Sequence, residues 1–164
     1  MQRVSLLCVG KLKEKFYADA AAEYAKRLSR YCRLEIVELP EERLPENPSP
    51  AQIEGALWKE AEAVRRKIPS SCRLIALCVE GRLRSSEELA RTMATWAAGA
   101  DSGLEKRLAF LIGGSFGLHA SLKAEAWDRL SMSPMTFPHH LARVMLLEQI
   151  YRAYQINGGT KYHK

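Results

Sequence analysis

The sequence has few cysteines, and they follow no pairing pattern. Its four cysteines (Cys8, Cys32, Cys72 and Cys78) form no C-x-x-C pair and have no histidine near them in the sequence. This spacing indicates neither a zinc site nor a thioredoxin-like redox motif. We therefore expect four small buried hydrophobic residues and no metal centre.

Long hydrophobic runs are also missing. The longest unbroken apolar run is the six residues from Leu74 to Val79, whereas a membrane-spanning helix needs roughly 18 or more. The N-terminal residues contain no apolar stretch followed by a small-residue cleavage site, and they soon become rich in lysine. We expect a cytoplasmic protein without a membrane partner.

The composition is that of a single globular domain. The chain has 164 residues, of which 47% are hydrophobic and 27% charged, with ten glycines and seven prolines. These values exclude a disordered or collagen-like chain. Because the sequence has no internal repeat and no linker long enough to separate two units, we expect one domain over residues 1–164.

Hydrophobic patterning predicts alternating strands and helices. Two capping boxes, Ser49 with Gln52 and Ser85 with Glu88, mark helix starts. Alternation of this kind predicts an α/β fold in which a parallel sheet is covered by helices on both faces. The expected strands are 3–9, 34–39, 74–79, 108–112 and 130–132, and the expected helices are 16–31, 50–68, 85–98, 120–127 and 141–156.

Positive charge is concentrated near the C-terminus. The formal net charge is +6, and residues 129–164 contain five Lys or Arg residues and one acid, Glu148. All four histidines lie in the last 46 residues. This distribution predicts an anionic ligand or RNA as the partner of this region, with a merely basic solvent-exposed surface as the alternative.

Two loops could carry a binding site. The buried strand at 108–112 ends in three glycines within five residues, Gly113, Gly114 and Gly117, where a ligand can approach the backbone at the carboxyl end of a strand. The turn lacks the Rossmann and P-loop patterns, which disfavours nucleotide hydrolysis, and an ordinary βα turn is the alternative. Residues 131–138 contain two prolines and two methionines, which suit a pocket wall for an adenine edge as well as a plain connection.

The last predicted helix and the tail raise a second pair of alternatives. Helix 141–156 is apolar on nearly every side, which predicts either a helix buried in the monomer or a helix covered by a second copy of the chain. The tail after Gly158 is either frayed or functional. Its Tyr162 and His163 lie beside Lys161 and Lys164, a combination able to stack on a base, contact phosphates and transfer a proton.

With these motifs in order, the whole chain resembles the small SPOUT-class ribosomal RNA methyltransferases that methylate N3 of a pseudouridine in 23S rRNA. The specific parts are Val9 to Leu12, Leu111 to Gly117, Thr136 to His139, Arg143, Tyr151 to Tyr154, and Tyr162 to Lys164.

The resemblance implies a C-terminal trefoil knot, S-adenosylmethionine as cofactor, no metal, a homodimer, and 23S rRNA within the large subunit or whole ribosome as substrate. One subunit's cofactor would face its partner's C-terminal residues. The residues implied in substrate chemistry are Arg152, Tyr162 and His163, while Ser115 and Phe116 receive no role. The residues implied in cofactor binding are Leu77, Gly113, Met132, Ser133, Pro134, Met135, Thr136 and Phe137.

The chemistry of methyl transfer agrees with these residue types. The transfer needs an in-line arrangement of nitrogen, methyl carbon and sulfur, and the weakly acidic N3–H must lose its proton. Two other functions remain open: a SPOUT enzyme acting on another RNA, such as a tRNA ribose methyltransferase, and a non-catalytic RNA-binding or ribosome-assembly factor.

Overall fold

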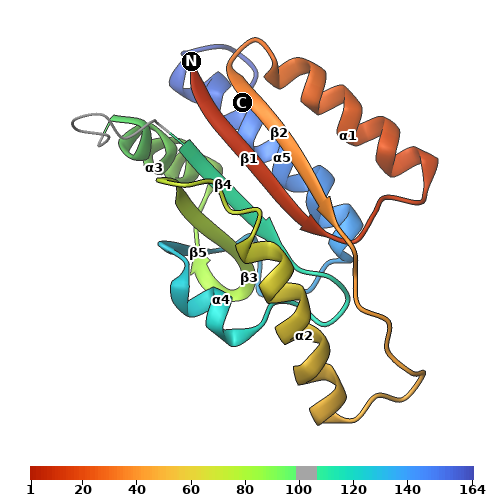
Figure 1. The fold of residues 1–164 in the computed structure, drawn as a ribbon. Helices are drawn as coiled ribbons and strands as arrows, with labels where there is room; N and C mark the ends of the chain where they lie inside the picture. The colour runs from red at the N-terminus through yellow and green to blue at the C-terminus, as the bar shows by residue number, and fades with distance from the viewer. Residues whose placement is uncertain (99–106) are drawn as a thin grey trace.

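The computed structural model describes residues 1–98 and 107–164, and in these ranges it contains every strand and helix that the sequence predicts. Figure 1 shows the elements in chain order. The strands are β1 (Gln2–Val9), β2 (Cys32–Leu39), β3 (Arg73–Leu83), β4 (Arg107–Ile112) and β5 (Asp128–Ser131). The helices are α1 (Lys15–Leu28), α2 (Pro50–Arg65), α3 (Ser86–Ala98), α4 (Ala120–Glu125) and α5 (His139–Asn157).

The five strands form one parallel sheet, which confirms the predicted fold class. Their order is β2-β1-β4-β3-β5, and every neighbouring pair is parallel. The carboxyl ends of β3 and β4 therefore lie next to each other, so the glycine turn after β4 and the last residues of β3 share one edge of the sheet. The trefoil knot implied by the resemblance stays a prediction.

Helix starts follow the capping signals in the sequence. At α2, the Ser49 hydroxyl accepts the N–H of Gln52 and the Gln52 side chain accepts the N–H of Ser49. Ser85 and Glu88 exchange the same pair of bonds before α3. Each box satisfies two backbone donors that the first helical turn leaves unpaired, which fixes the position where the helix begins.

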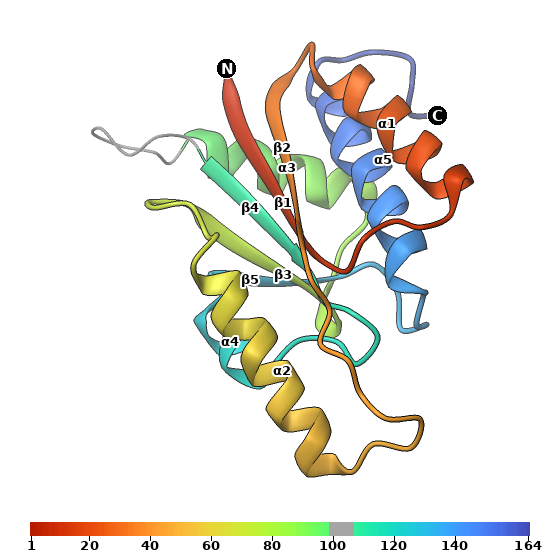
Figure 2. The same ribbon diagram turned by 45° about the vertical axis from the view of Figure 1, so that its right-hand side comes forward.

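Helices cover both faces of the sheet, as Figure 2 shows. On one face, α1, α3 and α5 pack against alternate residues of the strands, such as Leu6, Ile75 and Phe110. On the other face, α2 and α4 bury the intervening residues, such as Leu7, Ala76 and Leu111. Since both faces of β1 and β4 are buried, their continuous apolar sequences are explained.

The surroundings of α5 correct part of the expectation for this helix. It lies between α1 and α3 over the sheet, so three sides of its apolar surface are covered within one chain. Ile150 is fully buried in this core. Leu141, Val144 and Met145 remain half-exposed near its start, and Tyr151, Tyr154 and Ile156 near its end, so the surface left for a second subunit is smaller than the sequence predicts.

Strand β3 is longer than predicted and contains an irregularity. Its pairing with β5 shifts register between Leu77 and Arg82. A Cβ at Gly81 would lie 2.8 Å from the carbonyl carbon of Leu130, so the two strands approach too closely for any side chain there. The shift carries the chain from the carboxyl end of the regular strand, beside Leu77, toward α3.

The four cysteines are free thiols, of which Cys8 and Cys32 are buried and Cys72 and Cys78 are half-buried. Burial raises the pKa of the Cys8 thiol to about 12 and that of Cys32 to about 11. Over the described ranges, no group of three or more His, Cys, Asp or Glu side chains could hold a metal ion. None of the described helices combines the length and apolarity needed to cross a membrane.

Candidate methyltransferase site

A cavity of about 600 Å³ lies at the carboxyl ends of β3 and β4. Its walls are the end of β3 from Leu77 to Glu80, the glycine turn from Gly113 to Leu118, and the proline-rich loop between β5 and α5. Ala142 of α5 and Lys123 of α4 complete it. A cavity of this volume, mostly apolar with a few polar groups, is typical of a small-molecule or cofactor site.

The glycine turn is tight because its two ends touch. A Cβ at Gly113 would lie 2.4 Å from the carbonyl oxygen of Gly117, a distance that no real side chain tolerates. Gly117 itself has φ +81°, in the region that favours glycine, and open space faces its missing Cβ. Gly113 is therefore required by packing within the turn, and the positive φ belongs to Gly117.

Glu41 holds the outer side of this turn. Its carboxylate accepts the backbone N–H of Ser115 at 2.6 Å and lies 3.8 Å from Nε2 of His139, which also lines the cavity. Burial raises the pKa of Glu41, but the hydrogen bonds from Ser115 and the charge of His139 outweigh burial, and the net shift is downward. The carboxylate is thus ionised at neutral pH and fixes the backbone of the turn.

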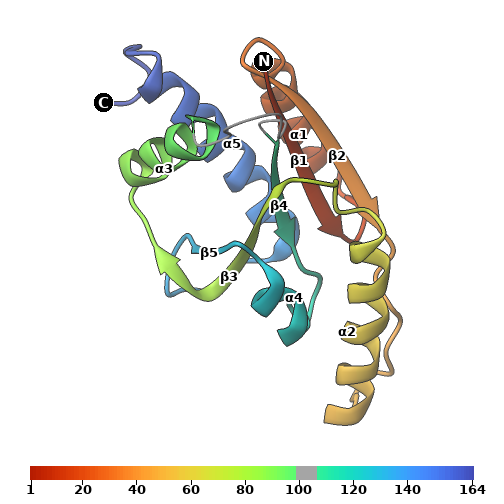
Figure 3. The same cartoon turned by 60° about the vertical axis from the view of Figure 1, so that its left-hand side comes forward.

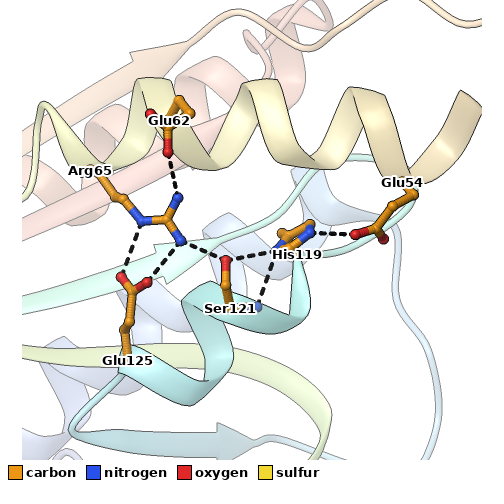
Figure 4. Close-up of polar contacts among 6 residues, drawn as sticks. All are labelled: Glu54, Glu62, Arg65, His119, Ser121 and Glu125. Atoms are coloured by element: carbon orange, nitrogen blue, oxygen red, sulfur yellow. Dashed lines mark hydrogen bonds and ion pairs between the residues drawn. The ribbon is translucent and has the colours of Figure 1, made fainter.

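A second polar network fixes the chain just after the turn, as Figure 4 shows. His119 caps α4 by accepting the N–H of Ser121, and its Nε2 bonds Glu54 of α2 at 2.6 Å. Arg65 of α2 bonds the Ser121 hydroxyl and both carboxylate oxygens of Glu125. Helices α2 and α4 are therefore tied together directly beside the glycine turn.

The proline-rich loop is held by short-range bonds of its serines. The Ser131 hydroxyl donates to the carbonyl of Ser133 at 3.0 Å, and the Ser133 hydroxyl accepts the N–H of Met135. The Met135 side chain is 71% exposed at the border of the cavity. The loop thus presents a soft apolar side chain and backbone groups outside the sheet ladder to a ligand.

The C-terminal tail is folded back onto α5 around Glu148. Arg152 pairs with the Glu148 carboxylate, and the Tyr162 hydroxyl donates to the same group at 3.1 Å. The Arg152 guanidinium also lies over the Tyr162 ring, 4.9 Å from its centroid. His163 joins Arg152, 3.2 Å away, to Glu87 of α3, 2.8 Å away. The tail side chains are thus ordered, which contradicts the frayed alternative.

These contacts set the protonation of two tail groups. Burial and the bond to Glu148 raise the pKa of the Tyr162 phenol to about 12, so the phenol is a hydrogen-bond donor at neutral pH. The hydrogen bond from His163 lowers the pKa of Glu87 to about 2. Around neutral pH the tail therefore presents a protonated phenol, a guanidinium and an imidazole in one cluster.

The structure brings most of the predicted cofactor residues together. Leu77, Gly113 and five residues of the proline-rich loop line the 600 Å³ cavity, whereas Pro134 of that loop is exposed and is not among its lining residues. The five are Met132, Ser133, Met135, Thr136 and Phe137. The predicted catalytic residues Arg152, Tyr162 and His163 form their own cluster, outside the described lining of this cavity.

Sequence reasoning missed several residues of both places. Cys78, Glu80 and Lys123 line the cavity, and Glu80 and Lys123 form an ion pair there. For Cys78 and Glu80, the available signal in the sequence was their position just after Leu77 at the end of the same strand. Glu148 lies one helical turn before Arg152, an i, i+4 spacing that predicts an ion pair.

The C-terminal basic residues are less exposed than their density in the sequence predicts. The Arg143 side chain is buried, pairs with Glu38 at 2.6 Å, and donates to the carbonyl of Gly10 at 2.8 Å. Arg152 is neutralised by Glu148. The positive field of this region therefore rests mainly on Arg129, Lys161 and Lys164, which are exposed.

Comparison with known proteins places the chain in a family. Residues 2–163 match the family model described as "Predicted SPOUT methyltransferase". Proteins named ribosomal RNA large subunit methyltransferase H are similar over 161 residues, which is 98% of this chain and 99% of each relative. Those from Clostridioides difficile, Bacillus cytotoxicus and Lactobacillus delbrueckii are 48%, 44% and 42% identical.

A solved structure shares the fold. It is titled as a probable methylase family protein from Haemophilus influenzae, and the match has a TM-score of 0.51 at 14% identity, covering 99% of this chain and 71% of that one. Together with the parallel sheet and the cavity at the glycine turn, the full-length family match leads to one conclusion. The chain belongs to the SPOUT methyltransferase family.

Proposed function

We propose that the protein transfers a methyl group from S-adenosylmethionine to N3 of a pseudouridine in 23S rRNA, on the large subunit or the assembled ribosome in the cytoplasm. The observation that carries this proposal is the cavity at the glycine turn, which gathers the residues expected to bind the cofactor. The names of the relatives support an rRNA substrate.

The cavity suits the proposed cofactor. Gly117 leaves open space in the wall, and Leu77, Ile112 and Phe137 offer apolar contacts for an adenosine group. The ion pair of Glu80 and Lys123 would face the charged amino-acid group of the cofactor. When bound, the cofactor supplies an electrophilic methyl group on sulfur, and the protein's task is to orient it toward the nitrogen that accepts it.

The tail cluster provides the groups expected at the substrate. The Arg152 guanidinium, whose charge Glu148 offsets, would favour the N3 anion of the base through its N–H donors. The protonated Tyr162 would donate a hydrogen bond to a base carbonyl. His163 is the remaining group able to accept the N3 proton, and its other ring nitrogen is already oriented by Glu87.

The separation of cluster and cavity supports a homodimer in which each site is composite. Within one chain, the tail side chains lie outside the described cavity lining. A partner subunit placed on the half-exposed Leu141, Val144 and Met145 would bring its own tail toward this chain's cofactor. Glutamate at Val144 tests this surface, whereas glutamate at Ile150 would destroy the core of the single chain.

Methylation of purified ribosomes tests the proposal. Nucleoside mass spectrometry of 23S rRNA should show N3-methylpseudouridine after incubation with wild type. Deletion of residues 160–164 should lower the rate at least ~100-fold, the lower end of an acid–base contribution, while cofactor titration is unchanged. Mixed dimers of this deletion with a Leu77→Arg variant should recover part of the activity. Methylation of another RNA, or binding without methylation, would contradict the proposed reaction, and the absence of recovery would contradict the composite site.

A further inference from the structure

A groove outside the methyltransferase site combines arginines with tryptophans. It has a volume of about 490 Å³ and lies between strand β3, helix α3 and the residue before β5. Figure 3 shows α3 above this β3–β5 edge of the sheet. The groove is lined by Arg73, Arg82, Arg84, Arg91, Trp96 and Trp127, among others.

The two tryptophans form one aromatic wall of the groove, and neighbouring side chains fix the position of Trp127. Trp96 is buried and meets Trp127 edge to face, with ring centroids 5.1 Å apart. The Arg73 guanidinium covers the Trp127 ring at 4.6 Å from its centroid. Trp127 nevertheless keeps 53% of its surface exposed. A large aromatic ring that is rigidly held and yet exposed is typical of a surface on which a ligand ring stacks.

The charges of the groove are positive in excess. Arg82 and Arg91 are exposed and make no ion pair with any other residue in the described ranges. Two acids offset part of this charge: Asp128 pairs with Arg84, and Glu88, which also lines the groove, accepts the N–H of Ser85 at the start of α3. Uncompensated arginines beside an exposed aromatic ring favour a ligand that carries both phosphates and planar rings.

Arg84 provides an independent sign of a ligand. Its side chain is only 6% exposed, and its Nη1 is buried without a hydrogen-bond partner among the described residues. A buried guanidinium nitrogen that lacks a partner costs free energy unless an acceptor reaches it. Because Arg84 lines the groove, a rotation of its guanidinium toward the groove would bring Nη1 to a phosphate oxygen bound there.

The groove is continuous with the reaction site. Arg84 also lines a second cavity, of about 490 Å³, together with Met132 and Glu148. Met132 lines the cofactor cavity as well, and Glu148 organises the catalytic tail. A strand whose target base lies at the cofactor cavity can therefore pass Met132 and Arg84 and continue along α3 into the groove of the same chain.

We propose that this arginine–tryptophan groove binds a single-stranded segment of the substrate RNA that flanks the modified base. Arg82, Arg84 and Arg91 would contact backbone phosphates, and one base would stack on Trp127. This inference rests on the proposed function, because it takes RNA as the substrate. It assigns part of the recognition to residues of β3 and α3, separate from Lys161 and Lys164 of the C-terminal tail.

Paired variants test the groove. In Arg82→Ala/Arg91→Ala the two exposed charges are removed without disturbing a buried contact. The matched control is Lys59→Ala/Arg66→Ala, which removes two exposed charges from α2 and its C-cap on the opposite face of the sheet. Binding of a fluorescent 23S rRNA fragment carrying the target loop is measured by anisotropy at several salt concentrations, and methylation of ribosomes gives kcat and KM.

The groove variant should bind RNA at least ~10-fold more weakly and lower the salt slope by about 1 to 2, since each lost phosphate contact removes about 0.7 to 0.9. Its KM should rise with little change in kcat, and its S-adenosylmethionine affinity should be unchanged. Trp127→Leu should weaken binding with an unaltered salt slope. An RNA affinity and a salt slope equal to those of the α2 control would overturn the inference. Loss of a protein partner in the groove variant with unchanged RNA binding would overturn it as well. Because the binding assay needs no methyl transfer, failure of the proposed reaction is detected separately.

Discussion

Replacement of His119 by alanine probes the network that fixes the chain after the glycine turn. His119 is 9% exposed, caps α4 through the N–H of Ser121, and packs edge to face on Trp58 with ring centroids 5.3 Å apart. Loss of the cap costs about 1 kcal/mol, and loss of the aromatic contact about 0.5 to 1.5 kcal/mol. The Glu54 side chain is 68% exposed, so its hydrogen bond to His119 adds at most about 0.5 kcal/mol.

The sum predicts that His119→Ala lowers the free energy of unfolding by about 1.5 to 3 kcal/mol. For a chain of this length, the corresponding fall in Tm is about 5 to 10 °C. Urea denaturation followed by circular dichroism measures the free energy, and a thermal melt measures Tm. The matched control is Glu54→Gln, which keeps the cap and the aromatic contact and should cost less than about 0.5 kcal/mol. A His119→Ala loss no larger than that of Glu54→Gln would refute the reasoning.

Three further predictions concern the cavity and the tail. Gly113→Ala should lower the free energy of unfolding by more than ~2 kcal/mol, because the new Cβ would meet the Gly117 carbonyl oxygen at 2.4 Å, and a chemical melt as stable as that of wild type would contradict this packing. Maleimide labelling followed by peptide mass spectrometry should show that S-adenosylmethionine protects Cys78, which lines the cavity, but leaves the rate at Cys72, a half-buried thiol outside the lining, unchanged. The pKa of Glu87 is lowered from 4.5 to about 2, so its ionised carboxylate should stabilise the fold fully above pH 4.5 and lose this effect as the pH falls toward 2. Wild type and Glu87→Gln should therefore have equal unfolding free energies at pH 2. A difference that persists at pH 2 would exclude this linkage.

The order of strands and helices could be predicted because each element has a signal within its own short stretch of sequence. Two capping boxes and a proline at the first position of α2 fixed helix starts to within a residue. The continuous apolar run from Leu74 to Val79 has no alternation, which predicts a strand buried on both faces. Leu74 to Ala76 are buried as predicted, whereas Leu77 and Cys78 are half-buried and Val79 is exposed. Local backbone satisfaction and burial therefore suffice to predict a parallel α/β domain.

The environment of α5 could not be predicted in the same way. The even distribution of apolar residues around this helix says that several sides are covered, but not whether the cover is the same chain or another. Only the packing of α1 and α3 on either side decides that Ile150 belongs to the core, while Val144 remains half-exposed. Burial depends on which elements neighbour a helix in space, and that neighbourhood is not encoded in its own periodicity.

The candidate site also has parts that the sequence predicts and parts that only the tertiary structure shows. The glycine turn, the proline-rich loop and the basic tail are short segments whose residue types identify them in the sequence. Only the tertiary structure shows that the Glu41 carboxylate accepts the N–H of Ser115, and that Glu148 contacts both Arg152 and Tyr162. It also shows that the Arg143 side chain is buried and donates to the carbonyl of Gly10. These contacts join residues that a folded sheet and its helices bring together, because hydrogen bonds and ion pairs depend on distance in space and leave no periodic trace in the chain. The same reason hides the groove of Arg82, Arg91 and Trp127, which three separate segments assemble at one edge of the sheet.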